Sequence, residues 1–314
     1  MTRILTNNAA SIKARLRNRH RETGGNFEFL LQRYAGERFL YRLGESPHRN
    51  LFVLKGAALF ALWGGPLYRP TQDLDFTGYG ESSPATVEER MRDICRVSEP
   101  TDGLEFDPQS LSSEPIRNAE VYGGINFRFK ARLGQALITM RIDVGFGDRI
   151  EPPPRDVEYP TLLPPLPAAQ IRAYPREAMI AEKAHAMAEF GELNTRIKDF
   201  YDLYTLARHF SFEAESLSRG IAATFEQRQT RIEALPATLT PRFFADARRS
   251  DEWRRYLSRN ALVTAPTDFT TVGELLLNFL APIWTALATN QPLRAIWPPG
   301  GPWQDPATAP EAST

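Results

Sequence analysis

Apolar residues recur at three- and four-residue steps over residues 8–43, which predicts helices, and Gly24-Gly25 separates two of them. Residues 52–63 are apolar and predict a short strand that continues as a helix after Gly56. A charged segment with an apolar stripe predicts another helix over residues 86–97. Residues 8–43 and 86–97 are therefore expected to be helical, and a short strand is expected at the start of residues 52–63.

The period changes in the middle of the chain. Residues 125–130 and 137–144 alternate between apolar and polar side chains, which predicts two neighbouring antiparallel strands joined near Gly134. Residues 69–76 show the same alternation and predict a further strand. Residues 104–145 as a whole are expected to be rich in strands.

The remaining half of the chain returns to helical spacing. Residues 151–167 are rich in proline and predict an extended connection. Five helices are predicted after it, over residues 176–190, 196–209, 212–228, 241–257 and 272–288. We therefore expect an α+β fold in which an N-terminal lobe, residues 1–165, has a mixed β-sheet flanked by helices. We expect an α-helical lobe, residues 166–296, to complete the active site, and residues 297–314 to form a disordered tail.

Composition narrows the partners only slightly. The 38 lysines and arginines balance 38 aspartates and glutamates, so net charge favours neither nucleic acid nor a membrane. Cys95 is the only cysteine, which excludes an internal disulfide and a cysteine-rich zinc site and fits a reducing compartment. The most apolar stretch, residues 275–288, is interrupted by Asn278 and Pro282 and predicts a core helix. Without an apolar leader, we expect a cytoplasmic protein with no membrane partner.

Three aspartates are the strongest chemical signal. On a strand, Asp73 and Asp75 point to the same face, with Cα atoms roughly 7 Å apart from a rise of about 3.3 Å per residue. Asp143 lies in a second predicted strand between apolar neighbours, where a charge needs a partner. If the two strands are adjacent, the three carboxylates could hold two divalent cations. The alternatives are an exposed strand end for Asp73 and Asp75 and an ion pair with Arg141 for Asp143.

Upstream of these aspartates, Lys55-Gly56-Ala57 stands where a helix is predicted to begin. A glycine followed by a small residue lets backbone N–H groups approach a phosphate, and the helix dipole assists. The alternative is close packing of the strand against the helix.

Polar residues of the later helices are a second signal. Lys183 lies on one helix face with Met179, Ile180 and Met187, so it either extends outward to solvent or meets carboxylates or a triphosphate. Asp199 and Asp202 are three residues apart and share a face. They form either a surface pair favoured by the helix dipole or part of the active site.

One segment mixes basic and aromatic residues. Residues 228–259 contain eight arginines together with Phe243, Phe244, Trp253 and Tyr256. This mixture suits RNA binding. Intervening acidic residues favour a solvated pair of helices instead.

Four segments in this order resemble the AbiEii/AbiGii family of nucleotidyltransferase toxins, which includes MenT-like toxins and belongs to the polymerase-beta-like superfamily. They are Phe52–Ala57 with Arg69–Asp75, Arg141–Val144, Met179–Lys183 and Arg196–Leu203. The sequence departs from the family at Ala57, where a serine or second glycine is usual, and at Arg141, where lysine is usual. The first change removes a hydroxyl contact to phosphate, and neither removes a metal ligand.

The resemblance implies a toxin of a toxin–antitoxin system. It would be a Mg²⁺- or Mn²⁺-dependent enzyme that uses a nucleoside triphosphate to modify the 3′ end of tRNA, with a cognate antitoxin as partner. The implied metal ligands are Asp73, Asp75 and Asp143, and the other implied catalytic residues are Lys183, Asp199 and Asp202. The implied nucleotide-binding residues are Lys55, Gly56, Ala57, Arg69, Thr71, Arg196 and Lys198. The alternatives are modification of a protein, either the antitoxin or the enzyme itself, and a non-catalytic interaction protein on the same scaffold.

Overall fold

The computed structural model describes residues 2–64, 69–116, 123–233 and 235–307, which form two compact units. Unit 1 comprises residues 1–148 and 154–174, and unit 2 comprises residues 149–153 and 175–314. The chain therefore passes between the units three times. The five residues 149–153 pack with unit 2: Arg149 pairs with Glu226, and the Glu151 carbonyl lies 2.8 Å from where a Cβ on Gly220 would stand.

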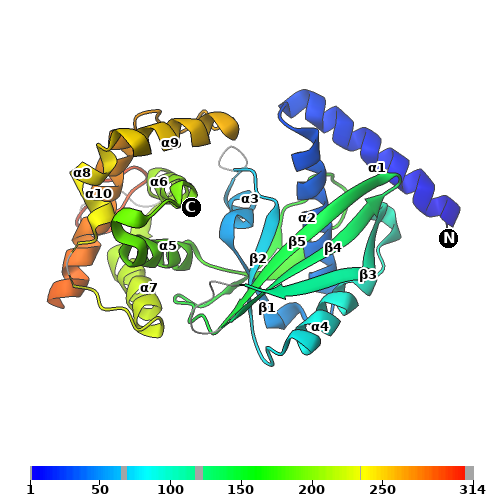
Figure 1. Ribbon diagram of the computed structural model, residues 1–314, viewed down its shortest axis with the longest axis horizontal. Coiled ribbons are helices and arrows are strands. Elements are labelled where there is room, and N and C mark those ends of the chain that lie inside the picture. Colours follow the sequence, from blue (N-terminus) through cyan, green and yellow to red (C-terminus); the bar gives the residue numbers. More distant parts are fainter. Residues whose placement is uncertain (1, 65–68, 117–122, 234, 308–314) are drawn as a thin grey trace. The chain divides into compact units, whose positions relative to one another are not determined.

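Unit 1 is built on a seven-stranded mixed sheet in the order β3-β4-β5-β2-β1-β7-β6 (Figure 1). The β2–β5 and β1–β7 pairs are parallel, and the other pairs are antiparallel. The strands are β1 (Phe52–Lys55), β2 (Asp73–Gly78), β3 (Leu104–Pro115), β4 (Gly124–Leu133), β5 (Ala136–Phe146), β6 (Arg155–Tyr159) and β7 (Ala169–Ala173).

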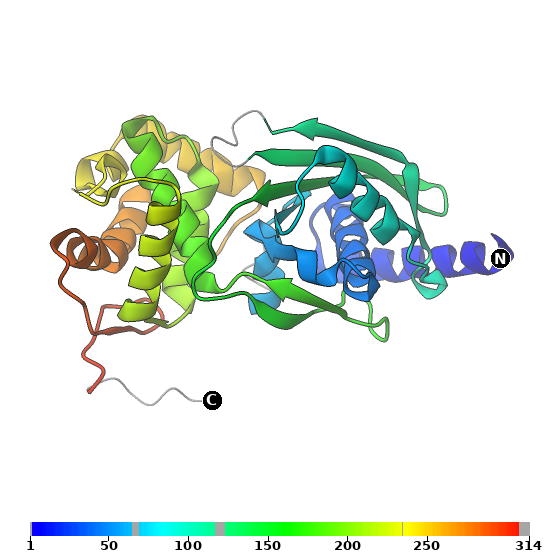
Figure 2. The same ribbon diagram turned by 90° about the horizontal axis from the view of Figure 1, so that it is seen from below.

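Helices cover the apolar face of this sheet (Figure 2). The helices of unit 1 are α1 (Thr2–Thr23), α2 (Phe27–Glu45), α3 (Phe60–Trp63) and α4 (Pro84–Arg96), with 3-10 turns η1 (Arg49–Leu51), η2 (Gly56–Leu59) and η4 (Pro100–Asp102). The Gly36 backbone of α2 approaches Leu74 of β2, and Phe39 packs its ring against Phe106 and Phe129 of β3 and β4. Because neighbouring residues alternate, the side chains next to Leu74 point to the other face of the sheet.

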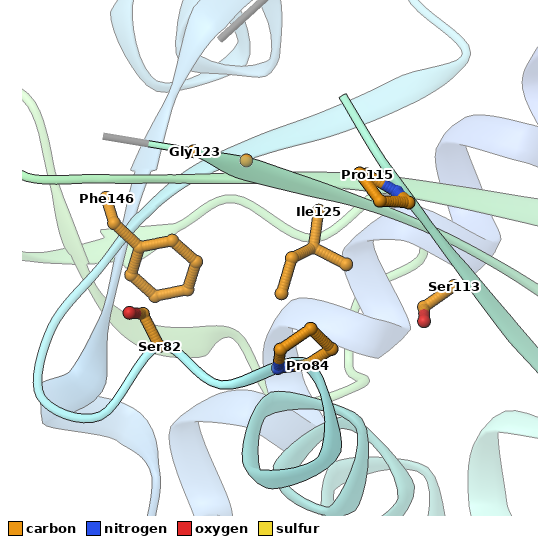
Figure 3. Close-up of a pocket in the computed structure, with 8 residues that line it drawn as sticks. Ser82, Pro84, Ser113, Pro115, Gly123, Ile125 and Phe146 are labelled. Atoms are coloured by element: carbon orange, nitrogen blue, oxygen red, sulfur yellow. The ribbon is translucent and has the colours of Figure 1, made fainter. Parts of the chain in front are cut away.

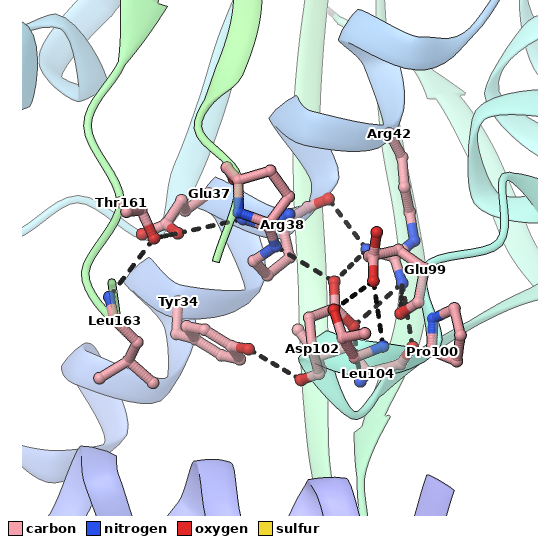
Figure 4. Close-up of polar contacts among 12 residues, drawn as sticks. Tyr34, Glu37, Arg38, Arg42, Glu99, Pro100, Asp102, Leu104, Thr161 and Leu163 are labelled. Atoms are coloured by element: carbon pink, nitrogen blue, oxygen red, sulfur yellow. Dashed lines mark hydrogen bonds and ion pairs between the residues drawn. The ribbon is translucent and has the colours of Figure 1, made fainter. Parts of the chain in front are cut away.

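Three charged residues of helix α2 form a buried group with Asp102 of η4. This α2 ion cluster consists of Glu37, Arg38, Arg42 and Asp102 (Figure 4). Asp102 accepts from Arg38 Nε at 3.1 Å and from both terminal nitrogens of Arg42 at 2.6 and 3.2 Å. Glu37 accepts from the Thr161 hydroxyl at 2.7 Å and from a backbone N–H at 2.6 Å. The cluster joins α2 to η4 and to the segment between β6 and β7, which are distant in sequence.

Unit 2 is helical. Its elements are α5 (Arg176–Phe190), η5 (Gly191–Leu193), α6 (Ile197–His209), β8 (Phe212–Glu213), α7 (Ala214–Gln227), η6 (Ala237–Leu239), α8 (Pro241–Phe244), α9 (Ala247–Arg259), α10 (Phe269–Thr289) and β9 (Ile296–Trp297). Phe200 of α6 is at the centre of its core and makes ring contacts with Phe243, Phe244 and Phe269.

Among the described residues, α10 is the only helix long and apolar enough to span a membrane by length and composition. It begins at Phe269, where Asp268 caps it, and contains Pro282. Its buried residues, from Phe269 to Trp284, face the other helices of unit 2, as expected for a core helix.

The predicted α+β fold class is confirmed: a mixed sheet with flanking helices precedes a helical region. Some elements differ from the prediction. Neither β6, inside the proline-rich connection, nor β7, which follows it, was predicted, because each strand has only five residues and prolines surround them. The helix predicted over 241–257 is two helices, since Asp246 caps a new one by accepting from the Arg249 N–H.

Part of the predicted disordered tail is packed. Trp297 of β9 is buried and donates to the Ala207 carbonyl, while Trp303 stacks on Phe279 and donates to its carbonyl. Two apolar indole rings supply the burial that the surrounding prolines and glycines do not suggest. Residues 308–314 lie outside the described residues.

Candidate active site

Strand pairing in unit 1 places the three predicted metal ligands on one face of the sheet. Asp75 of β2 is directly beside Asp143 of β5, and Asp73 is beside Arg141 in the same parallel ladder. Asp73 and Asp75 are two residues apart on one strand and therefore point the same way. All three carboxylates are half-buried, on the face opposite Leu74 and Phe76.

The same row continues onto neighbouring strands. Lys55 of β1 is opposite Asp75, and Asn126 of β4 is opposite Asp143. The Asn126 side-chain amide donates to Asp143 Oδ1, and Arg128 Nε donates to Asn126 Oδ1 at 3.2 Å. These two contacts fix the orientation of the amide and, through it, of the Asp143 carboxylate. Asn126 was not among the predicted site residues, although its alternation with Ile125 and Phe127 puts it on the polar face.

Gly56 is required where it stands. Its φ is +71°, which only glycine adopts without strain, and a Cβ there would lie 2.1 Å from Asp75 Oδ2. The carboxylate of Asp75 therefore lies against the backbone at the start of η2. Ala57 and Ala58 are buried, so their side chains pack inward while the turn borders the carboxylate row.

The other predicted nucleotide-binding residues of unit 1 flank this row. Lys55 Nζ pairs with Asp148 Oδ2 at 2.8 Å. Arg69 is buried just before β2, and Thr71 donates its hydroxyl to the Asp73 carbonyl at 3.2 Å, which orders the approach to the strand. The predicted strand from residue 69 begins only at Asp73.

In unit 2, the structure gathers a second group of charges, the α5–α6 ion cluster, made of Lys183, Arg196, Asp199 and Asp202. Lys183 Nζ lies 2.6 Å from Asp199 Oδ1 and 2.8 Å from Asp202 Oδ2. Arg196 Nε lies 2.7 Å from Asp199 Oδ2. Lys183 therefore meets carboxylates rather than solvent alone, whereas Lys198 points outward and is exposed.

Charge pairing decides the ionisation of Asp199. Burial by itself would raise the pKa of this carboxyl, but Lys183 and Arg196 outweigh burial and lower the pKa to about 2. Asp199 is consequently a carboxylate at any physiological pH. It can orient the lysine and accept hydrogen bonds, but it cannot act as a proton donor there.

The carboxylates suit a hard divalent cation by donor type, because Mg²⁺ and Mn²⁺ prefer carboxylate oxygens. Asp75 and Asp143 are paired in the β2–β5 ladder. Because Gly56 has no Cβ, no side-chain carbon of that residue lies against the Asp75 carboxylate. Within the described residues, no three His, Cys, Asp or Glu side chains are grouped closely enough to hold a metal ion. The three-carboxylate metal site remains a prediction.

Two other features contain none of the predicted site residues. Phe243, Phe244 and Trp253, in the basic and aromatic segment, are buried in unit 2 and cannot stack on RNA bases, which supports the solvated-helix interpretation. A pocket of about 180 Å³ lies between the start of α4 and the strand ends near Ile125 and Phe146 (Figure 3). Ile125 and Phe146 are an odd number of residues from Asn126 and Asp143, so this pocket is on the opposite face of the sheet.

Comparison with known proteins agrees with the resemblance. The family model described as nucleotidyl transferase AbiEii toxin, type IV TA system, matches residues 38–275. A Helicobacter pylori crystal structure described as a candidate nucleotidyltransferase has 15% identity and a TM-score of 0.43, covering 83% of this chain and 95% of that chain. JHP933 from Helicobacter pylori has 15% identity and a TM-score of 0.42, covering 81% and 89%. No curated protein sequence matches the chain. Because the family model spans most of its length, the chain belongs to the AbiEii family of nucleotidyltransferase toxins of type IV toxin–antitoxin systems.

Proposed function

We propose that this nucleotidyltransferase uses Mg²⁺ and a nucleoside triphosphate to add a nucleotide to the 3′ end of tRNA, which blocks translation. The observation that supports this most is the register of β2 and β5, which sets Asp75 beside Asp143. Two half-buried carboxylates at adjacent positions repel each other, and a divalent cation removes that cost. The resemblance supports tRNA as the acceptor, and Mn²⁺ is an alternative metal.

Asp73, Asp75 and Asp143 are the proposed metal ligands. When bound, the metal ions would neutralise charge on the triphosphate and make the attacking hydroxyl more acidic. Asn126 holds Asp143 in place by its hydrogen bond, so that ligand is oriented before substrate arrives. Such orientation matters because positioned charge supplies much of the rate in phosphoryl chemistry.

The reaction forms one bond and breaks one bond. The acceptor hydroxyl oxygen attacks the α-phosphorus, and the bond from that phosphorus to the bridging oxygen breaks. Pyrophosphate leaves with the electron pair, and the hydroxyl proton passes to a carboxylate of the Asp73, Asp75 and Asp143 group.

In unit 1, the proposed phosphate-binding groups are Lys55, the backbone N–H groups of Gly56 and Ala57, and the side chains of Arg69 and Thr71. In unit 2, Lys183 is the proposed phosphate-binding ammonium, with Arg196 and Lys198 as further cations. Asp199 and Asp202 orient Lys183.

Family membership implies two partners, a nucleoside triphosphate and an antitoxin. The direct test is transfer of label. The purified protein is incubated with Mg²⁺, total tRNA and each of the four nucleoside triphosphates labelled at the α-phosphate. We expect label on tRNA from at least one nucleotide, loss of label in Asp75→Asn and Asp143→Asn, and loss with EDTA that added Mg²⁺ restores.

Asp156→Asn is the matched control, because Asp156 is an exposed carboxylate in β6 of the same unit that pairs only with Arg49 in the described structure. It should label tRNA as well as the unchanged protein. Label on protein instead of tRNA would mean that the acceptor is a protein and not tRNA. Absence of both label and nucleotide binding would leave a non-catalytic interaction protein.

A further inference from the structure

Asp148 lies just after β5 and is surrounded by three donors, one from β1, one from β2 and one from Tyr174, which follows β7. Its Oδ2 accepts from Lys55 Nζ at 2.8 Å, from the Thr77 hydroxyl at 2.9 Å and from the Tyr174 hydroxyl at 3.3 Å. The two hydroxyls are also 2.6 Å apart. None of the sequence patterns pointed to Asp148, because its lysine partner is 93 residues away.

This group lies on the same sheet face as the carboxylate row. Lys55 is opposite Asp75, and Thr77 is two residues after Asp75 on the same strand, so both side chains share its face. The Tyr174 N–H donates to the Leu54 carbonyl at 2.9 Å, which continues the β7 ladder beside β1. The ion pair is therefore at the edge of the candidate active site.

Strand β5 passes close beneath the pair. A Cβ built on Gly145 would lie 3.9 Å from both Asp148 Oδ2 and Lys55 Nζ. Gly145 is two residues beyond Asp143 and shares its face. The lysine ammonium is thus held at a defined place relative to Asp143 as well as to Asp75.

A lysine needs such support to bind phosphate well. Its ammonium is on a flexible four-carbon stem, and immobilising such a side chain on binding costs conformational entropy. Lys55 and Asp148 are only 17% and 19% exposed, so their attraction is less screened than that of a surface pair. An ammonium has three N–H donors, so a phosphate oxygen can bind it while Asp148 keeps its hydrogen bond.

We propose that Asp148 is a positioning residue that, together with Thr77 and Tyr174, fixes the Lys55 ammonium for the phosphates of the nucleoside triphosphate. This inference deepens the proposed function and rests on it. The two hydroxyls hold the carboxylate, and the carboxylate holds the lysine. Asp148 therefore acts through Lys55 and not by touching the substrate.

A double-mutant cycle tests this in the full-length protein. Binding of each nucleoside triphosphate with Mg²⁺ is measured by calorimetry for the unchanged protein, Asp148→Asn, Lys55→Met and the double variant. We expect Asp148→Asn to weaken binding about tenfold and to raise KM more than it lowers kcat. In the Lys55→Met background, the Asp148→Asn change should have almost no further effect.

Thr77→Val removes one donor without changing charge, and a two- to threefold weakening that also disappears with Lys55→Met is expected. Thr77→Val takes the place of Asp148→Asn in the cycle if Asp148→Asn does not fold. Asp156→Asn, on an exposed carboxylate of the same unit, should bind like the unchanged protein. Equal losses from Asp148→Asn or Thr77→Val with and without Lys55 would overturn the inference. Failure of the unchanged protein to bind or transfer any nucleotide would instead reject the proposed function.

Discussion

Each unit contains a group of two cations and two carboxylates, and the two groups differ mainly in their access to solvent. In the α2 ion cluster, Asp102 is between Arg38 and Arg42; in the α5–α6 ion cluster, Asp199 is between Lys183 and Arg196. The arginines of the first are 0% and 2% exposed. In the second, Lys183 is 12% exposed and Arg196 is 48% exposed.

The difference separates a structural role from the proposed binding role. The α2 ion cluster has hydrogen bonds to the Leu104 and Pro167 carbonyls and the Thr161 hydroxyl, all within the protein. Its charges are sealed, so they can fix the fold but cannot meet a ligand. The α5–α6 ion cluster presents its cations toward solvent while its carboxylates are buried beneath them. Buried charge alone therefore does not mark an active site, and it is the exposure of the α5–α6 cations that supports their proposed binding role.

The largest effect should come from breaking the sealed cluster. Asp102→Asn leaves two buried guanidinium groups without their carboxylate, which should lower the free energy of unfolding by about 3–5 kcal/mol. Urea unfolding followed by tryptophan fluorescence and circular dichroism measures it. Activity per folded molecule should stay unchanged, and a selective loss of activity would contradict the structural role.

Lys183→Met should act mainly on catalysis. If Lys183 binds the triphosphate as proposed, removing its charge should lower nucleotide transfer about 100-fold or more. Single-turnover transfer per folded molecule is the measurement, because the variant also leaves Asp199 and Asp202 without their lysine. Lys183→Arg keeps the charge and should retain part of the activity. Full activity in Lys183→Met would remove this lysine from the proposed site.

The two clusters should respond to pH with opposite signs. The folded pKa of Asp199, about 2, lies below its unfolded value near 3.9, so its contribution to stability is present above about pH 4 and lost as pH falls toward 2. Burial raises the pKa of Glu37, despite hydrogen bonds that lower it. Its unfolded form ionises first, near pH 4.3, so stability falls as pH rises through the folded pKa.

Unfolding free energies from pH 2.5 to 7 would show this contrast. The cost of Asp199→Asn should shrink as the pH falls below about 4. The cost of Glu37→Gln should be greatest below about pH 4.3 and shrink as the pH rises. Parallel trends in the two variants would contradict the opposite shifts.

The smallest effect should come from Arg196. Its side chain is about half exposed, and its pair with Asp199 is partly screened by solvent. Arg196→Gln should weaken the free energy of nucleotide binding by about 0.2–1 kcal/mol, which is at most about a fivefold loss of affinity. Titration of the nucleotide at low and high salt would measure it, with a smaller difference between variant and unchanged protein at high salt.

The sequence predicted the parts of the site that depend on local spacing. Alternation put Asp73 and Asp75 on one strand face, and helical spacing put Asp199 beside Asp202. It could not show which strands pair, and so it gave Asp143 a place only on the condition that β2 and β5 are adjacent. The contact of Asp148 with Lys55 and the burial of Arg38 and Arg42 come from residues about 60–90 positions apart, which no local pattern records.

The three passages of the chain between the units constrain how such a gene can change. Residues 149–153 belong to unit 2 but are encoded between two parts of unit 1, and the Glu151 carbonyl fills the space beside Gly220. A single recombination point anywhere in the gene would therefore separate at least one unit from a piece of itself. Neither unit can be exchanged as one contiguous cassette, so the two units of this chain are expected to be inherited together.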